Sequence, residues 1–92
     1  MKLYRIEQNV NTRYDTYDSA VIAAESTSAA KHTHPCGVYV WRDGAWYHIG
    51  HQEPMSSLFD EWASPSDVEV VYIGEAKEGT PAGVILTSYN AG

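Results

Sequence analysis

Hydrophobic and polar residues alternate along several short stretches of the chain, a pattern typical of β-strands with one buried face. Residues 3–8 alternate in this way, and residues 68–73 and 84–89 are two further stretches rich in β-branched side chains. Residues 19–25 instead form a continuous run of small and β-branched residues, which indicates a strand buried on both faces. The pattern therefore predicts four strands outside the hairpin described next.

The clearest local signal is a β-hairpin over residues 38–49. Asp43-Gly44 lies between two β-rich runs, and this pair is favoured in two-residue hairpin turns because both residues adopt positive φ. The turn predicts the cross-strand pairs Arg42–Ala45, Trp41–Trp46, Val40–Tyr47 and Tyr39–His48. One face, which we expect to join the core, then consists of Val38, Val40, Tyr47 and Ile49. The other face is an aromatic ladder of Tyr39, Trp41, Trp46 and His48.

Two short helices are predicted between the strands. The hydroxyl residues at 26–28 can cap a helix, and Pro35 disfavours helical geometry at His34, so this helix ends near residue 32 or 33. Residues 56–62 carry apolar side chains at positions 58, 59 and 62, which fits a short amphipathic helix. The fold class is α+β: one compact domain over residues 1–92, with a mostly antiparallel sheet of about five or six strands.

Composition and charge narrow the range of partners. The chain is 92 residues long and 43% hydrophobic, with a net charge of −6. Residues 1–46 contain five basic and five acidic residues, whereas residues 47–92 contain one basic and seven acidic residues. An acidic chain is not expected to bind duplex nucleic acid non-specifically. A single cysteine and the lack of a signal-like or membrane-spanning apolar run favour a cytoplasmic protein without a membrane partner.

All four histidines and the cysteine fall between residues 32 and 51, at His32, His34, Cys36, His48 and His51. These are zinc-ligand types, but their spacing matches no common zinc finger. If one helix includes both His32 and His34, their side chains point to opposite sides of it. We therefore favour the interpretation that these histidines bind no metal, and we predict no cofactor.

Common catalytic motifs are absent from the sequence. It contains no Gly-x-Ser-x-Gly, no P-loop, no Gly-x-Gly-x-x-Gly and no His-Glu-x-x-His. Cys36 and a nearby histidine would be a nominal nucleophile–base pair, with no further pattern to support it. We expect a protein that is not an enzyme and has no catalytic residues.

Two groups of residues are candidates for ligand binding. The first lies in residues 13–19 and contains Arg13, Tyr14, Asp15, Tyr17 and Asp18. It forms either a recognition loop or a polar turn that leads into the next strand. The second is the ladder tryptophan pair, Trp41 and Trp46, since stacking a base on an aromatic side chain is worth about 1–3 kcal/mol. The alternative for this pair is that the helix at 56–62 covers it as core.

Several segments resemble a family of small proteins encoded by bacteriophages. They are Tyr14-Asp-Thr-Tyr-Asp-Ser-Ala-Val, Ala30-x-x-x-His34-Pro35, Val70-x-x-Ile73-Gly74-Glu75-Ala76, and Gly83-Val84-Ile85 with Ser88-Tyr89-Asn90-Ala91-Gly92. The resemblance covers most of the chain and is weaker over residues 36–66. It implies a location in the host cytoplasm and a non-catalytic counter-defence role. It also adds His34, Ser88 and Asn90 to the candidate ligand-binding residues.

In that setting the first hypothesis is a homo-oligomer that sequesters a nucleotide-like immune signal and completes its pocket across subunits. Arg13, Lys31 and Arg42 would hold phosphates while tyrosines or tryptophans stack on bases. The second hypothesis is an inhibitor that binds a host defence protein through the acidic surface. The third is a small zinc-binding or hydrolytic protein that uses the histidine cluster at 32–51.

Overall fold

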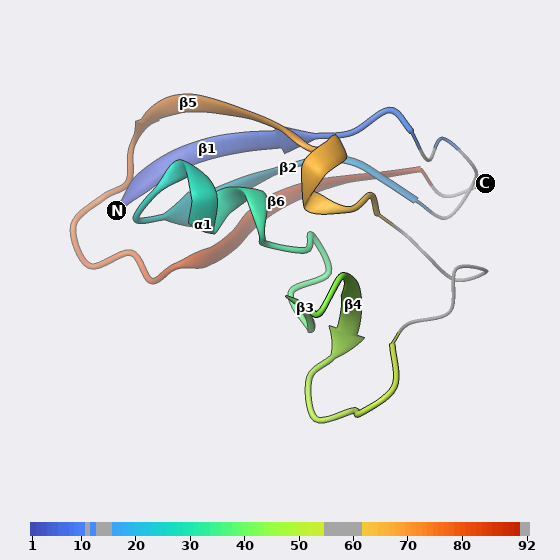
Figure 1. The fold of residues 1–92 in the computed structure, drawn as a ribbon. Helices are drawn as coiled ribbons and strands as arrows, with labels where there is room; N and C mark the ends of the chain where they lie inside the picture. The colour runs from blue at the N-terminus through green and yellow to red at the C-terminus, as the bar shows by residue number, and fades with distance from the viewer. Residues whose placement is uncertain (11, 13–15, 55–61, 91–92) are drawn as a thin grey trace.

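The computed structural model describes residues 1–10, 12, 16–54 and 62–90. Along the chain the elements are β1 (Lys2–Glu7), β2 (Thr16–Ala24), α1 (Thr27–Lys31), β3 (Tyr39–Arg42), β4 (Ala45–His48), the 3-10 helix η2 (Pro65–Asp67), β5 (Glu69–Glu75) and β6 (Gly83–Asn90). Four strands form an antiparallel sheet in the order β5-β1-β2-β6, and β3 and β4 form a separate two-stranded sheet (Figure 1). The predicted α+β class with a small antiparallel sheet is confirmed.

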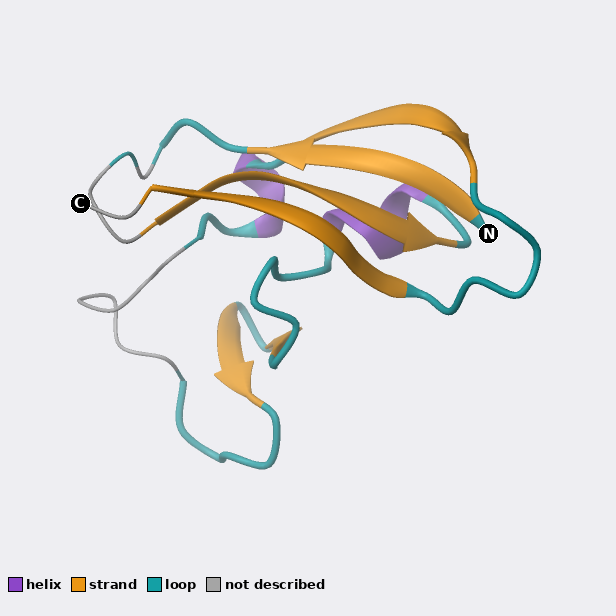
Figure 2. Ribbon diagram, turned by 180° about the vertical axis from the view of Figure 1, so that it is seen from behind, coloured by secondary structure: helices purple, strands orange, loops and turns teal. Residues whose placement is uncertain are grey.

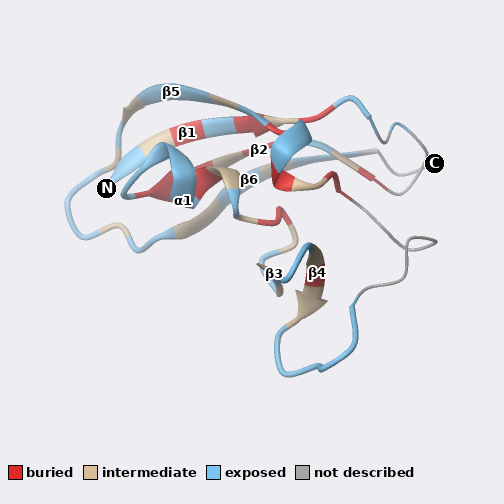
Figure 3. Ribbon diagram, in the orientation of Figure 1, coloured by how far each residue is buried: buried red, intermediate tan, exposed pale blue. Residues whose placement is uncertain are grey.

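One face of the four-stranded sheet is covered. Figures 1 and 2, which view the molecule from opposite sides, place α1 and η2 on the same face of this sheet. The side chains that point toward them alternate along the strands and include Tyr4, Ile6 and Ile22, each at most 3% exposed (Figure 3). No helix in the described part of the chain is long and apolar enough to cross a membrane.

Strand β2 differs from its prediction in two ways. It begins at Thr16, so Thr16, Tyr17 and Asp18, which were expected in a polar turn before Ser19, belong to the strand. It is also not buried on both faces throughout, because Ser19 and Val21 are only half-buried on the uncovered side. The strand is longer because β1 and β6 pair with β2 on either side and extend the ladder beyond the apolar run. One face stays partly open because α1 and η2 lie on the other face of the sheet (Figures 1 and 2).

The helix α1 forms as the capping residues predict. The Ser26 hydroxyl accepts a hydrogen bond from the Ala29 backbone N–H at 3.1 Å, which satisfies one of the donors at the helix start. His32 is the C-cap, so the helix ends three residues before Pro35. The second predicted helix, at 56–62, falls on residues outside the described ones except for Trp62, which is fully buried.

The hairpin has the predicted register, with Trp41 opposite Trp46 and Val40 opposite Tyr47. Asp43 and Gly44 both have positive φ, at 50° and 80°, as the two-residue turn requires. The prediction of its core face is wrong. Trp46, on the aromatic face, is 4% exposed, whereas Val40 on the opposite face is 42% exposed.

The physical reason for this orientation is the larger apolar area of the aromatic side chains. Trp46 packs in the same core cluster as Trp62 and Ile22, with Trp41 and Tyr39 against it. Its indole N–H donates a 3.0 Å hydrogen bond to the Ala63 carbonyl, so the polar atom of the ring is satisfied inside the core. The opposite face, with Val38, Val40, Tyr47 and Ile49, offers less apolar area to bury and faces away from the core.

We expect the two hairpin faces to respond differently to substitution. Trp46→Ala should reduce the free energy of unfolding by about 3–5 kcal/mol, because it empties a large buried site and removes a satisfied hydrogen bond. Val40→Ser should change it by less than about 0.5 kcal/mol, because Val40 is exposed. Urea denaturation followed by circular dichroism measures both. A larger loss for Val40→Ser than for Trp46→Ala would contradict the observed orientation.

Candidate functional site

Residues from distant parts of the sequence meet at one end of the four-stranded sheet. The β2–β6 register places Tyr17 opposite Tyr89 and Ser19 opposite Ser88, with Asp18 as the extra residue of a bulge in β2. We call Tyr17, Asp18, Ser88 and Tyr89 the sheet-end cluster. Three of the predicted site residues are therefore adjacent, although Asp18 and Ser88 lie 70 positions apart in the chain.

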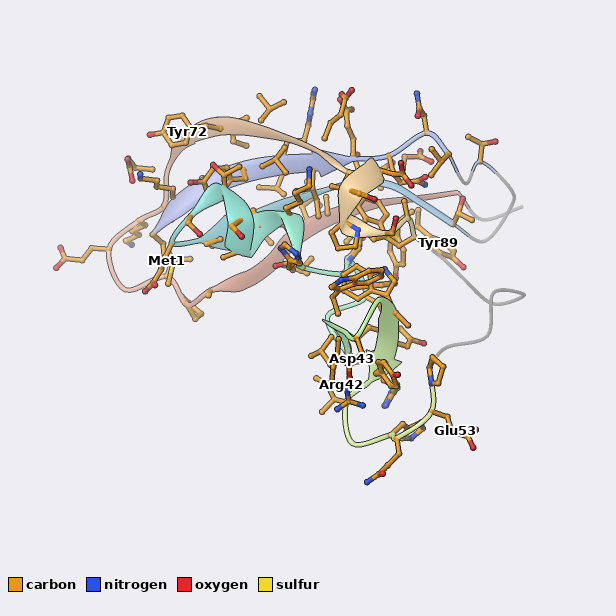
Figure 4. The ribbon with its side chains drawn as sticks, viewed as in Figure 1. Met1, Arg42, Asp43, Glu53, Tyr72 and Tyr89 are labelled. Carbon is orange, nitrogen blue, oxygen red and sulfur yellow. The ribbon has the colours of Figure 1, made fainter. Side chains whose placement is uncertain are left out.

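The sheet-end cluster combines two rings with polar groups. The Tyr17 and Tyr89 ring centroids are 4.8 Å apart with an interplanar angle of 62°, an edge-to-face contact. The Ser88 hydroxyl donates to a carboxylate oxygen of Asp18 at 3.4 Å, and both residues are exposed. Tyr89 is 43% exposed, and Figure 4 shows it away from the hairpin tip marked by Arg42 and Asp43. Alternation along β6 places the Tyr89 ring on the covered face with Tyr17, and Ser88 with Asp18 on the opposite face. A ligand at this end of the sheet would therefore reach both groups around the edge strand β6.

The start of β2 is held in place from β1. The Gln8 side-chain amide donates a 2.8 Å hydrogen bond to the Tyr17 carbonyl, and the Gln8 backbone N–H donates to the Asp18 carbonyl at 3.1 Å. Gln8 is itself buried, so these bonds fix the backbone at the bulge. Sequence reasoning missed Gln8, since a lone glutamine after a strand carries no signal of this role.

His34 lies under the cluster, in the loop after α1. It is 1% exposed, and its ring contacts Tyr39 and Trp46 of the hairpin at centroid distances of 4.6 and 5.1 Å, and Tyr17 of the sheet at 6.2 Å. The Cys36 backbone N–H donates to Nδ1 at 3.0 Å. Among the described residues, Nε2 has no hydrogen-bond partner. Burial lowers the pKa of His34 to about 4, so the ring is neutral at pH 7. In this conformation His34 supports Tyr17 from inside the protein.

The remaining predicted residues divide into two groups. Arg13, Tyr14 and Asp15 lie outside the described residues, and for Asn90 only the backbone is described, paired with Thr16. Trp41 and Trp46 make an edge-to-face contact with centroids 5.2 Å apart, and Trp46 is core rather than an open stacking platform.

A polar concavity lies at the tip of the hairpin. It has a volume of about 490 Å³ and is lined by Arg42, Asp43, Tyr47, Gly50, His51 and Gln52. The Arg42 guanidinium lies 4.1 Å from the centre of the Tyr47 ring, which is cation–π distance. Arg13 and Lys31 are the other two bases expected to hold phosphates. Arg13 lies outside the described residues. The Lys31 ammonium donates a hydrogen bond to the Val68 carbonyl at 3.3 Å.

The histidines and the cysteine do not assemble into a metal site in the described part of the chain. No group of three or more His, Cys, Asp or Glu side chains there is placed to hold an ion. The His48 and His51 rings contact one another at 4.5 Å, while His32 Nδ1 lies 2.8 Å from the Ser28 carbonyl on α1. The zinc hypothesis therefore finds no ligand set among these residues.

Comparison with family models, with curated proteins and with solved structures finds no match for this chain.

His34 makes stability depend on pH in a defined window. In the unfolded chain its pKa is about 6.5 and in the folded protein about 4, so between these values only the unfolded state takes up the proton. The free energy of unfolding should fall by about 3 kcal/mol from this residue as the pH decreases from 7 to 4. Well above pH 6.5 neither state binds this proton, and the residue contributes no pH dependence.

The test compares urea denaturation of wild type, His34→Asn and His32→Asn between pH 4 and pH 7. Asparagine keeps an acceptor for the Cys36 N–H and cannot take up the proton. The pH dependence should be shallower in His34→Asn and unchanged in His32→Asn, where the replaced side chain is exposed. Parallel curves for His34→Asn and wild type would refute the assignment.

Proposed function

We propose that this chain is a non-catalytic binding protein that takes a nucleotide-like ligand at the sheet-end cluster. The observations that carry the proposal are the exposed Tyr89 ring packed against Tyr17 and, on the opposite face of the same edge strand, the Asp18 carboxylate and the Ser88 hydroxyl. An exposed aromatic face suits a planar base, and stacking contributes about 1–3 kcal/mol. The carboxylate can accept hydrogen bonds from ribose hydroxyls or base N–H groups, and the hydroxyl can donate or accept.

The charges of the site suggest how such a ligand would be oriented. Asp18 repels phosphate, so the sugar or the base belongs next to it and the phosphates belong farther away. Arg13 is the base nearest in sequence, three positions before Thr16 where β2 begins, and it is our candidate for the phosphate contact. A local base of this kind is needed because the chain as a whole has a net charge of −6.

The biological setting of the proposal comes from the resemblance to small bacteriophage proteins. There, a protein that holds a nucleotide signal without changing it would act against host immunity in the host cytoplasm. Binding without turnover is part of the proposal.

Replacement of the exposed ring should weaken binding selectively. We expect Tyr89→Leu to reduce the affinity for a nucleotide at least about tenfold, because it removes the stacking surface. Tyr72→Leu is the matched control: Tyr72 is a comparably exposed tyrosine at the opposite edge of the sheet, on β5 (Figure 4). Titration calorimetry with AMP and with cyclic di-AMP measures both variants beside wild type.

Native mass spectrometry of the protein purified from phage-infected cells completes this test. A retained mass of several hundred daltons, released unchanged on denaturation, would support the proposal and identify the ligand class. Equal affinities for Tyr89→Leu and Tyr72→Leu, or release of a chemically altered nucleotide, would refute it.

A second candidate function rests on an acidic concavity at the edge of the sheet. Glu7, Asp67 and Glu69, with Gln8 and Asn9, line a volume of about 200 Å³ that suits a lysine or arginine side chain of a host defence protein. Under this alternative, Glu69→Lys would abolish capture of a host protein in a pull-down from defence-active cells, while Tyr89→Leu would leave capture unchanged.

A further inference from the structure

Strand β6 is an edge of the four-stranded sheet, and among its described residues a bulge near its start is the one feature that protects an edge. Its neighbour in the sheet is β2, and its other side pairs with no strand among the described residues. It is eight residues long and contains neither a charged residue nor a proline. Ile85 and Leu86 on it are 52% and 66% exposed. Natural proteins that remain monomeric commonly blunt such edges with charges, prolines or very short strands.

The opposite edge, β5, differs in the feature that matters for self-association. It carries Glu69 and Glu75, and Tyr72 donates a 2.9 Å hydrogen bond to the Glu75 carboxylate. Two copies of β5 side by side would bring four carboxylates together, which is unfavourable. Two copies of β6 would bring no charge together. Self-pairing is therefore favoured at β6 and opposed at β5.

The alternation of side chains limits how two β6 strands can pair. Ile85 is the extra residue of a bulge, since Val21 lies opposite Leu86 and Ile22 opposite Val84. Residues 86–90 follow without another irregularity on β6, and they form its regular half. Side chains directly opposite in an antiparallel pair share a face. In a two-fold symmetric pair, one residue must therefore lie opposite its own copy, with the two-fold axis between them. An axis at Ser88 uses all of residues 86–90 in both copies.

We propose that β6 pairs antiparallel with β6 of a second copy of this chain, about a two-fold axis at Ser88. Leu86 of each copy then lies opposite Asn90 of the other, and the two sheets join into one continuous sheet. The pairing continues the backbone hydrogen-bond ladder of the sheet from one copy to the other. The pairing does not rest on the proposed ligand, although it lies beside the sheet-end cluster.

The association should be weak and sensitive to salt. An edge pairing of this length buries less than the roughly 800 Å² per partner of a standard interface, so we expect dissociation in the micromolar range. Each copy also carries a net charge of −6, and repulsion between the copies opposes pairing. Raising the ionic strength from about 0.02 M to about 0.3 M shortens the screening length and should tighten the dimer.

Sedimentation velocity of the full chain without added nucleotide tests the proposal over a range of protein concentrations. Wild type should approach twice the monomer mass of 10.2 kDa, and Leu86→Lys should remain monomeric because it places two like charges at the pairing edge. Val71→Lys is the matched control: Val71 is 42% exposed on β5 and faces the same uncovered side of the sheet. It should dimerise like wild type.

A cross-link tests the register. In a Cys36→Ala background, Ser88→Cys should form a disulfide-linked dimer under mild oxidation, whereas Val71→Cys should not. A monomeric wild type overturns the proposal. Loss of the dimer in both lysine variants also overturns it, because that result indicates packing between the uncovered sheet faces. Loss in neither variant overturns it as well, since the interface then lies elsewhere. Nucleotide titration of Leu86→Lys separates this outcome from the fate of the proposed function.

Discussion

The aromatic packing around His34 connects the two sheets of this protein. Its neutral ring lies between Tyr17 of the four-stranded sheet and Tyr39 and Trp46 of the hairpin. In a chain with a single phenylalanine, histidine and tyrosine rings supply much of the contact area between these parts. The imidazole can be buried because the ring is uncharged, and the Cys36 N–H donates a hydrogen bond to one of its nitrogens. The position of the hairpin and the support of Tyr17 both depend on this contact.

That arrangement separates the two kinds of surface on the molecule. Of the rings that contact His34, Trp46 is core, and Tyr17 and Tyr39 are partly buried against the core. Tyr89 packs against Tyr17 and remains partly exposed, while Asp18 and Ser88 contact one another on the opposite face of the sheet. At this end of the sheet the aromatic pair is supported from the core, and the Asp18–Ser88 pair is exposed on the opposite face.

The two edges of the four-stranded sheet differ in how they favour association with a second copy of the chain. Acidic residues flank the β5 edge, while the β6 edge is neutral and bears exposed aliphatic side chains. Because the sheet-end cluster belongs partly to β6, ligand binding and pairing of two copies would share a strand. The net negative charge, which lies in the second half of the chain, makes two copies repel one another and opposes their association.

Local chemistry in the sequence determined the hairpin and its register, because the Asp43-Gly44 turn acts within a few residues. It likewise determined the start of α1, where the Ser26 hydroxyl caps its own helix. Only the tertiary structure decided which hairpin face is buried, since both faces are apolar and the outcome depends on what packs against them. It also decided that Asp18 and Ser88 are neighbours, because pairing between strands so far apart in the chain leaves no local signal.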